Sequence, residues 1–591
     1  MLGLGSAAAR VRVGAFAVPI LVILGALLLF GSGGGDDSHI TWWVVDELTR
    51  TGKIVNLNGD ALEQSSSLGL VLLAAAVRLL LPIATPALGV LLSLLALGGT
   101  CWLTGRLARR LDPALEIPAS LLVATSGPLV YWATSGMETS LAAFATVWLL
   151  DAFARLLELP RSVARSELIT WRLGGNLLAA SAWFVSVRPE NPLLLAGILL
   201  STGLICGFEW QRKPAAEPAL NVPILIGGAL LSVLPAIALF LFRRWKFHEW
   251  FPHPVSAKAG GGTRWGAGWS YLLDHSLQFQ PALLLLLPLS ALLLIALTLT
   301  GRRKPLLAVF AAHSLLGVLF VLSSGGDWMS CGRFLAPLLP VWWLTVLGAA
   351  HFVAQARRAY LVYGSLALAA ANLTLLVRLA HGGGTNGYPL TAARTVVPAA
   401  RAEYGLANYP FLELANKSHL RDALLAEELK RVVKQVATIT PGKIWIASGQ
   451  AGGAPYHLFS AFPDKLRFID FWGLTNSEAR ACLPARKLKH SSLGVALTPE
   501  LLYQYRDVVL RDCGVPMADI VFNTGLRAGT RRGLEQRGYT VVYFQHGAMP
   551  SYSGDSWLRG GTSIDAYIAV RRELAERLQL QYREIRWTLS G

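Results

Sequence analysis

Long apolar stretches dominate the first 380 residues and constrain the fold more than any other feature of the sequence. An α-helix needs about 20 mostly apolar residues to cross the hydrocarbon core of a bilayer. Stretches of about this length lie near 14–31, 85–104, 115–132, 138–158, 173–187, 191–208, 221–242, 281–300, 305–323, 333–353 and 359–380. The sequence therefore predicts a polytopic α-helical membrane protein with about 11 transmembrane helices.

Charged residues are scarce and unevenly distributed. The chain is 53% hydrophobic and 15% charged, whereas soluble globular proteins carry about 25% charged residues. In residues 381–591, 44 of 211 positions are charged, against 45 of 380 in the first part. This composition excludes a disordered chain and a disulfide scaffold, and it predicts a membrane domain at 1–380 and a soluble domain at 381–591. The net charge of +17 includes no long Lys/Arg run, so we expect no nucleic-acid partner.

Loop charges predict the orientation in the membrane. The stretch 67–81 is shorter than a span and carries Arg78, so we expect a short interfacial or re-entrant helix there. If it does not cross, one set of loops is short and basic, as cytoplasmic loops are; its members include Arg106, Arg109, Arg110, Arg161, Arg165, Arg172, Arg212, Lys213, Arg302, Arg303, Lys304, Arg357 and Arg358. The N-terminus is then cytoplasmic, and external loops lie at 32–66 and 243–280. The soluble domain lies on the external face.

The soluble part alternates β-rich runs with helical patterns. Strands are predicted at 443–447, 466–471, 520–523, 540–544 and 564–570, and helices after the turn at 448–453 and at 525–536 and 571–580. Alternation of this kind predicts a small α/β domain. Cys482 and Cys513 could pair in an oxidising external compartment, and two free thiols are an equal alternative.

The loops on the external side carry the polar residues that suggest chemistry. Asp36 and Asp37 follow the first span, and an adjacent carboxylate pair can supply a general base together with a group that orients a hydroxyl or holds a cation. A solvated loop that ends a helix is the alternative. Further candidates for binding a substrate are His39, Glu63, Gln64, Glu138, Glu190, His253, Asp327 and Trp328. The predicted span centres are nearly free of ionisable groups, which argues against a transporter.

One external loop runs against the positive-inside rule. Residues 243–280 interleave basic and aromatic side chains: Arg243, Arg244, Lys246, Lys258 and Arg264 with Trp245, Trp250, Trp265 and Trp269. An anionic lipid phosphate would account for the external charge, and an interfacial aromatic belt is the equal alternative. On charge and sidedness, Arg188, Arg264 and Arg333 are candidate phosphate ligands.

Seven short motifs, taken in order, resemble a known family. They are Gly35-Asp36-Asp37, Tyr131–Thr139, Arg188-Pro189-Glu190, Pro254–Gly261, Gly325–Met329 with Gly332-Arg333-Phe334, Ala451–Tyr456 and Asp470–Thr475. Together they resemble the GT-C glycosyltransferases, and within these the terminal arabinofuranosyltransferases. The resemblance is spread over about residues 33–480, and no motif can be assigned to 490–591.

The resemblance implies transfer of a pentose, D-arabinofuranose, from a polyprenyl-phosphate donor to an external acceptor. It assigns catalysis to Asp36 and Asp37, places Lys258 near the donor phosphate, and puts the protein in a bacterial inner membrane with its active site on the periplasmic face. The expected acceptors are an envelope polysaccharide or a pilin-like protein. No cofactor is required by this chemistry and no metal ligand is predicted, although a divalent cation at the acidic pair is compatible with it.

Two segments depart from the family pattern. His39 and Trp42-Trp43 stand where Tyr and Phe-Arg are common after the acidic pair, and Glu63-Gln64-Ser65-Ser66 replaces Glu-Gly-Tyr-Thr. These departures leave the sugar and the acceptor open. The alternatives are a GT-C enzyme that uses mannose or an aminosugar, and a non-enzymatic transporter of polyprenyl lipids or glycans.

Overall fold

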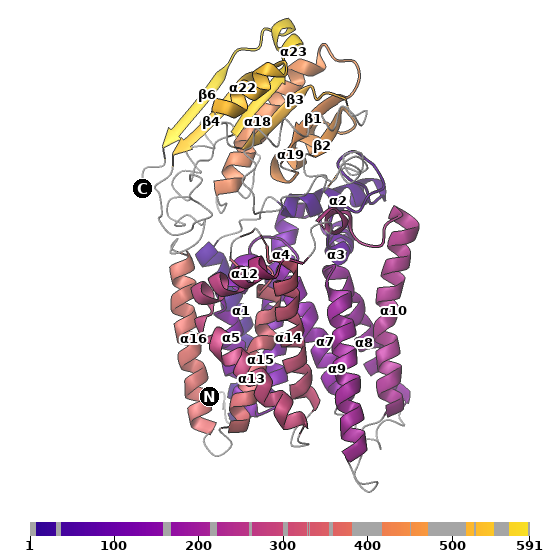
Figure 1. Cartoon of the computed structure of the whole chain (residues 1–591), viewed down its shortest axis with the longest axis vertical. Coiled ribbons are helices and arrows are strands. Elements are labelled where there is room, and N and C mark those ends of the chain that lie inside the picture. The colour runs from indigo at the N-terminus through magenta and orange to yellow at the C-terminus, as the bar shows by residue number, and fades with distance from the viewer. Residues whose placement is uncertain are drawn as a thin grey trace, which may run out of the picture.

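The computed structural model describes most of both predicted domains. The described residues are 7–30, 37–157, 167–212, 222–258, 263–299, 305–327, 329, 331–353, 358–380, 417–449, 451–470, 475, 516–524, 528–548 and 566–588. They form a helical bundle with a small α/β domain at one end of it (Figure 1).

The bundle consists of a series of helices along residues 7–380. They are α1 (Ala7–Phe30), α2 (Ser38–Thr51), α3 (Leu68–Leu80), α4 (Thr85–Arg109), η1 (Pro113–Leu115), α5 (Glu116–Ala124), α6 (Gly127–Ala133), α7 (Thr139–Leu157), α8 (Glu167–Val187), α9 (Asn191–Arg212), α10 (Val222–Phe247), α11 (His253–Lys258), α12 (Trp265–Phe279), α13 (Pro281–Leu299), α14 (Pro305–Ser324), η4 (Ala336–Leu338), α15 (Leu339–Val353) and α16 (Arg358–Ala380). Helix α2 lies across the end of the bundle that faces the α/β domain (Figure 1).

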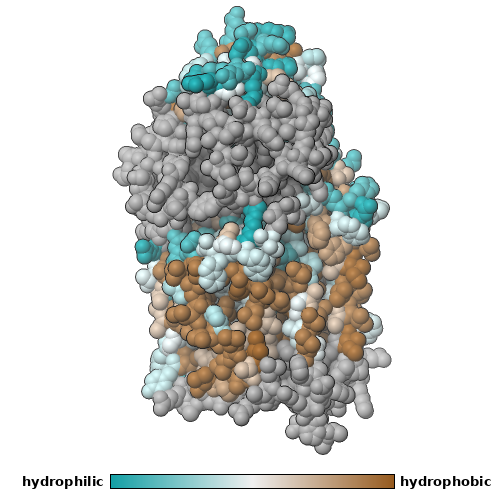
Figure 2. Space-filling model, viewed as in Figure 1, coloured by the Kyte–Doolittle hydropathy of each residue, from teal (hydrophilic) through white to brown (hydrophobic). Residues whose placement is uncertain are grey.

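The surface of the bundle is suited to lipid. Among the described residues, six helices are long and apolar enough to cross a membrane, or up to eight if each of two bent helix pairs is one span. Large apolar side chains point outward, for example Leu193, Leu230 and Leu285. Figure 2 shows a band of apolar residues across the visible face of the bundle, with hydrophilic residues on the α/β domain. The polytopic helical fold is confirmed, whereas the count of 11 spans stays a prediction.

Two predicted segments have a different form. The stretch 115–132 is not one straight helix, because it bends by 64° between α5 and α6. Pro128 lies in the first turn of α6. It has no N–H to donate to the carbonyl of Ala124, the last residue of α5, so a continuous helix would lose this hydrogen bond. The segment 243–280 is mostly helical rather than a loop, since α10 continues to Phe247 and α12 meets α13 at 116°.

The described residues of the α/β domain form a six-stranded mixed sheet in the order β2-β1-β3-β5-β4-β6. Its elements are α18 (Lys417–Ala437), β1 (Ile444–Ser448), α19 (Gly453–Ala461), β2 (Leu466–Asp470), β3 (Ile520–Thr524), α22 (Ala528–Gln536), β4 (Tyr539–Ala548), β5 (Ala566–Arg571), α23 (Arg572–Arg577) and β6 (Arg583–Thr588). β1 pairs in parallel with β2 and β3. The predicted strands and the α/β class are confirmed, and β6 and α18 are additional elements.

The loop between α2 and α3 holds the α/β domain against the bundle. The side-chain amide of Asn58 donates to the carbonyl of Phe468 at 2.9 Å and accepts from its N–H at 2.6 Å. Because β2 is an edge strand, this amide satisfies backbone groups that a neighbouring strand would otherwise bind. Asn56 also donates to the carbonyl of Thr475 at 2.8 Å.

Candidate active site

Six predicted site residues meet at the end of the bundle that faces the α/β domain. We call them the rim cluster: Asp37, Glu138, Arg188, Glu190, Asp327 and Arg333. Arg333 contacts two of the acids, since its Nη1 lies 3.8 Å from Asp37 Oδ2 and its Nε donates to Asp327 Oδ2. Arg188 contacts the other two, with Nη1 at 3.2 Å from Glu138 Oε1 and Nε donating to Glu190 Oε1. Four carboxylates therefore share two guanidinium groups.

The rim cluster is held by the ends of five helices. Asp37 precedes α2, Glu138 precedes α7, Arg188 and Glu190 follow α8, and Asp327 follows α14. Arg333 lies three residues before η4. Residues that are far apart in the chain meet because each follows or precedes a helix that ends at the same side of the bundle.

A pair of glycines presents Asp327 to Arg333. Gly325 and Gly326 both have left-handed backbone conformations, with φ of +83° and +76°. A Cβ atom on Gly326 would lie 2.3 Å from Cγ of Tyr271, so no other residue fits without displacing that ring. The turn therefore fixes the direction in which Asp327 leaves α14.

Asp37 is the most accessible acid of the rim cluster. Its side chain is 26% exposed, whereas that of Asp327 is 4% exposed. Asp37 is the N-cap residue of α2, and its carboxylate makes no cap hydrogen bond with the helix. The positive end of the helix dipole favours an ionised carboxylate at this position. Asp37 thus combines a favourable site for negative charge with access from outside.

Electrostatic attraction keeps Arg333 charged. Burial on its own would lower the pKa of Arg333, but the carboxylates of Asp327, Glu138 and Asp37 raise it above its ordinary value. Arg188 and Arg333 also lie beside the ring of Phe334, with Cζ atoms 5.1 and 5.7 Å from the ring centroid. Both distances are within the range of cation–π attraction.

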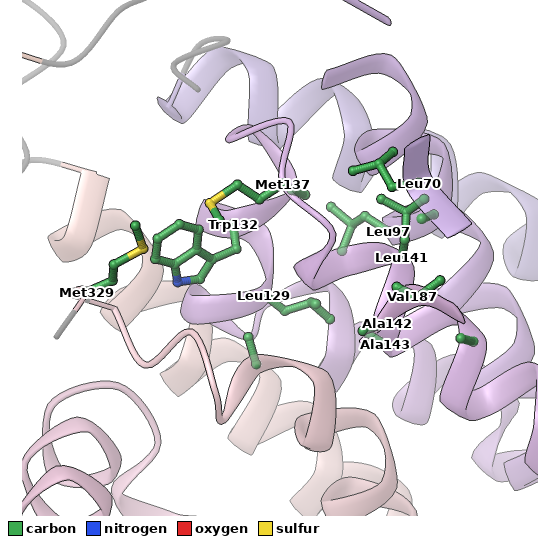
Figure 3. Close-up of a cluster of buried hydrophobic side chains, with 14 of the residues drawn as sticks. Leu70, Leu97, Leu129, Trp132, Met137, Leu141, Ala142, Ala143, Val187 and Met329 are labelled. Atoms are coloured by element: carbon green, nitrogen blue, oxygen red, sulfur yellow. The ribbon is translucent and has the colours of Figure 1, made fainter. Parts of the chain in front are cut away.

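An apolar layer adjoins the rim cluster. Figure 3 shows the indole of Trp132 flanked by the sulfur-containing side chains of Met137 and Met329. Trp132 Nε1 donates to the carbonyl of Cys331 at 3.1 Å, and Arg333 Nη1 lies 4.0 Å from Met137 Sδ. The charged side chains of the rim cluster therefore adjoin a densely packed apolar layer, which limits their movement.

A second group of predicted residues lies around Glu63. Arg243 binds Glu63 with two hydrogen bonds, of 2.8 Å from Nε and 3.1 Å from Nη2, and both side chains are buried. Burial raises the pKa of Glu63 above its ordinary value, although Arg243 acts in the opposite direction. His253 donates its backbone N–H to the carbonyl of Glu63, and its Nδ1 lies 3.0 Å from Glu249.

The basic segment at 243–280 differs from its interpretation as a cationic loop. Arg243 lies near the C-terminal end of α10, just before its last turn, and forms an ion pair with Glu63. Arg244 binds the carbonyl of His248 and lies 6.0 Å from the ring centroid of Trp250. The exposed side chains of Trp245, Trp265 and Trp269 fit an interfacial aromatic belt.

The remaining predicted residues have other positions. His39 is buried beside Trp42 and the α/β domain, and Gln64 binds the backbone of Leu57 and Ile40. Arg264 precedes α12, and its side chain lies next to Gly325. Asp36, Trp328 and the side chain of Lys258 lie outside the described residues.

Tyr271 contributes to the site although its sequence context does not indicate this. Its hydroxyl accepts the backbone N–H of Phe334 at 3.1 Å, which fixes the loop that carries Arg333. A tyrosine within an apolar segment resembles any other interfacial aromatic residue, so no local signal could have indicated this contact. Among the residues that the structure describes, no group of three or more His, Cys, Asp or Glu side chains is arranged to hold a metal ion.

Comparison with solved structures shows the fold. An oligosaccharyltransferase from Archaeoglobus fulgidus, solved with a tethered acceptor peptide, is 12% identical, with a TM-score of 0.51 over 92% of this chain and 74% of its own length. The chain has a GT-C fold. ArnT from Cupriavidus metallidurans, solved with undecaprenyl phosphate, is also 12% identical, with a TM-score of 0.48 over 96% of this chain and 98% of its own.

The sequence comparison adds one relative of known activity. The terminal β-(1→2)-arabinofuranosyltransferase of Corynebacterium glutamicum is 27% identical over an alignment of 256 residues that covers 39% of this chain. The match spans about a third of that relative, 34% of its length. No family model matches the chain.

Proposed function

We propose that this protein is an integral-membrane glycosyltransferase that transfers D-arabinofuranose from a polyprenyl-phosphate donor to an external glycan or glycoprotein. The observation that carries the proposal is Asp37, an accessible carboxylate beside Arg333 at the rim of a GT-C fold. The motif resemblance and the partial match to an arabinofuranosyltransferase support the choice of sugar.

In the proposed reaction, Asp37 is the general base. It accepts the proton of an acceptor hydroxyl, and the hydroxyl oxygen attacks the anomeric carbon of the donor sugar. The bond between that carbon and the phosphate oxygen breaks, and polyprenyl phosphate leaves with the bonding electrons. Asp36 is the adjacent acid in the sequence, and we assign it the orientation of the acceptor hydroxyl.

The geometry of the rim cluster refines the roles of the arginines. Arg188 and Arg333 each contact two carboxylates, so we infer that they position these acids. Of the four predicted phosphate ligands, Lys258 and Arg264 are then the ones that we assign to the donor phosphate. Arg264 lies next to the turn that carries Asp327, which places it at the edge of the rim cluster.

The proposal is tested with purified protein in liposomes that contain decaprenyl-phosphate arabinofuranose and an arabinan acceptor. Asp37→Asn should reduce the rate of transfer by at least about 100-fold, because it removes the general base. Asp464→Asn is a matched control, since Asp464 is exposed on the α/β domain and its left-handed backbone also suits asparagine. Wild-type transfer by Asp37→Asn would contradict the proposed role.

The same assay separates the alternative functions. Donors that carry mannose or an aminosugar should give no product, and transfer from one of these alone would replace arabinofuranose as the substrate. Movement of labelled lipid across the vesicle membrane without any glycosylated product would indicate a transporter. Mass spectrometry of envelope glycans and glycoproteins from a deletion strain would then identify the acceptor.

A further inference from the structure

Asp46 joins four helices from both domains. It lies in α2, the helix that begins immediately after Asp37. Its Oδ1 accepts from Thr85 at the start of α4 and contacts Arg78 of α3, and its Oδ2 accepts from the hydroxyl of Tyr456 at 2.7 Å. Tyr456 belongs to α19 of the α/β domain. One carboxylate thus connects α2 with two neighbouring helices of the bundle and with the external domain.

The contact with Tyr456 is part of a continuous stripe on α2. The rings of His39 and Tyr456 lie 5.3 Å apart, those of His39 and His457 lie 5.5 Å apart, and those of Trp43 and Phe459 lie 5.9 Å apart. Positions 39, 43 and 46 share one face of a helix because they are separated by one turn. The face of α2 that begins two residues after Asp37 therefore packs on α19.

The hydroxyl of Tyr456 stays protonated, so it can always donate its hydrogen bond to Asp46. Burial raises its pKa to about 12, although the charge of Arg78 acts in the opposite direction. The hydroxyl therefore keeps its proton at any pH at which the protein would be assayed. Its hydrogen bond to an ionised acceptor is of the stronger, charge-assisted kind.

The docking of the α/β domain does not depend on this hydrogen bond alone. Asn58 binds the backbone of Phe468 through two hydrogen bonds, and Asp60 lies 3.4 Å from Arg467. These contacts come from the loop after α2 rather than from α2 itself. Removal of the Tyr456 hydroxyl should therefore leave the domains together while α2 becomes less constrained.

We propose that Tyr456 is a positioning residue, which acts through Asp46 to fix α2 and thereby the carboxylate of Asp37. The external domain then takes part in the reaction by holding the helix that begins at the general base. This inference rests on the proposed function for its kinetic consequence. Its structural consequence, restraint of α2 by α19, is independent of which sugar is transferred.

The test compares Tyr456→Phe with Tyr582→Phe. Tyr582 is an exposed residue of the same domain whose hydroxyl binds Glu584 at 3.1 Å, so its substitution removes an equivalent group far from α2. Tyr456→Phe should lower kcat about 10-fold, because a small displacement of a reacting group has a large effect on rate. The KM for the lipid donor should stay within about twofold of wild type, since the donor ligands are unchanged.

Hydrogen exchange of the full-length protein in nanodiscs supplies a readout that does not depend on activity. The amides of α2 should exchange about 10-fold faster in Tyr456→Phe than in Tyr582→Phe, while those of β2 stay unchanged. Asp46→Asn retains an oxygen that can accept from Tyr456, so it should have a smaller effect on α2 than Asp46→Ala.

A kcat for Tyr456→Phe within about twofold of the control, or unchanged exchange in α2, would overturn the proposal. If the wild-type protein transfers no sugar from any lipid donor, the proposed function is wrong, and hydrogen exchange alone decides whether Tyr456 restrains α2.

Discussion

Two ionic clusters, each with at least one buried carboxylate, lie towards opposite ends of the same helix. The rim cluster includes Glu138, which immediately precedes α7, whereas Asp151 lies in the second half of α7. Asp151 is contacted by Arg106 at 2.7 Å, Arg155 at 2.9 Å and Arg110 at 3.0 Å. We call these four residues the Asp151 cluster.

The two clusters differ in the sign of their excess charge. In the rim cluster four carboxylates share two arginines, and in the Asp151 cluster three arginines share one carboxylate. Excess arginine is expected where short loops meet the cytoplasm. The rim cluster, at the other end, has more carboxylates than arginines. Its accessible carboxylate, Asp37, can therefore accept a proton or a hydrogen bond from a substrate hydroxyl. Burial of ion pairs is thus common to both ends, and the unbalanced acid distinguishes the candidate active site.

The largest effect is expected from Arg188→Met in the rim cluster. It removes the partner of both Glu138 and Glu190, and an uncompensated buried charge typically costs about 3–5 kcal/mol of stability. Thermal unfolding in detergent should show a large drop in the midpoint. The double variant Arg188→Met with Glu138→Gln should recover part of this loss, because it also removes one of the unpaired carboxylates. If the wild type and Arg188→Met had equal unfolding midpoints, the ion pair between Arg188 and Glu138 would have no structural role.

Asp151→Asn should have a smaller effect and affect only stability. It weakens charge-assisted hydrogen bonds to three arginines, each of which retains access to water, so we expect a loss of about 1–3 kcal/mol. Transfer per folded molecule should equal that of the wild type. A reduction in transfer that exceeds the loss of folded protein would show that the Asp151 cluster also contributes to function, and the contrast between the two ends would fail.

Several parts of this arrangement could be predicted from local sequence patterns. The acidic motif after the first span, the Arg188-Pro189-Glu190 segment and the Gly325-Gly326-Asp327 turn each follow a helix, so their gathering at one rim follows from the direction of the spans. The strands at 443–447 and 520–523 are predictable because runs of β-branched and aromatic residues between turns are a local signal.

Other parts depend on contacts that sequence spacing does not encode. Arg243 resembled a loop cation because nothing local indicates that Glu63, 180 positions away, neutralises it. The pairing of Asp46 with Tyr456 joins residues 410 positions apart. The strand β6 is not predicted from the sequence because its alternating pattern, Arg583–Thr588, is short and rich in charge. In each case a tertiary contact, rather than a local preference, decides the outcome.

Asp327→Asn should change the rate with little change in stability. The substituted amide would still accept the hydrogen bond of Arg333, but it would no longer balance the charge of that guanidinium beside Asp37. The Asp37 carboxylate would then be a weaker base, so transfer at neutral pH should be about 10-fold slower. The acid limb of the pH–rate profile should move to lower pH, because the stronger positive field favours the ionised carboxylate. A limb that moves to higher pH would contradict this arrangement.

The smallest effect is expected from Phe334→Leu, which separates charge balance from packing within the rim cluster. The substitution keeps an apolar side chain beside Arg188 and Arg333 but removes the aromatic ring that both guanidinium groups approach. Cation–π contacts contribute about 0.5–2 kcal/mol each, so we expect a loss of about 1 kcal/mol and a rate within about threefold of wild type. Thermal unfolding and the transfer assay measure the two quantities. The substitution leaves all six charges of the rim cluster in place. If transfer by Phe334→Leu were as slow as transfer by Asp327→Asn, the ring of Phe334, rather than the balance of charge around Arg333, would set the position of Asp37.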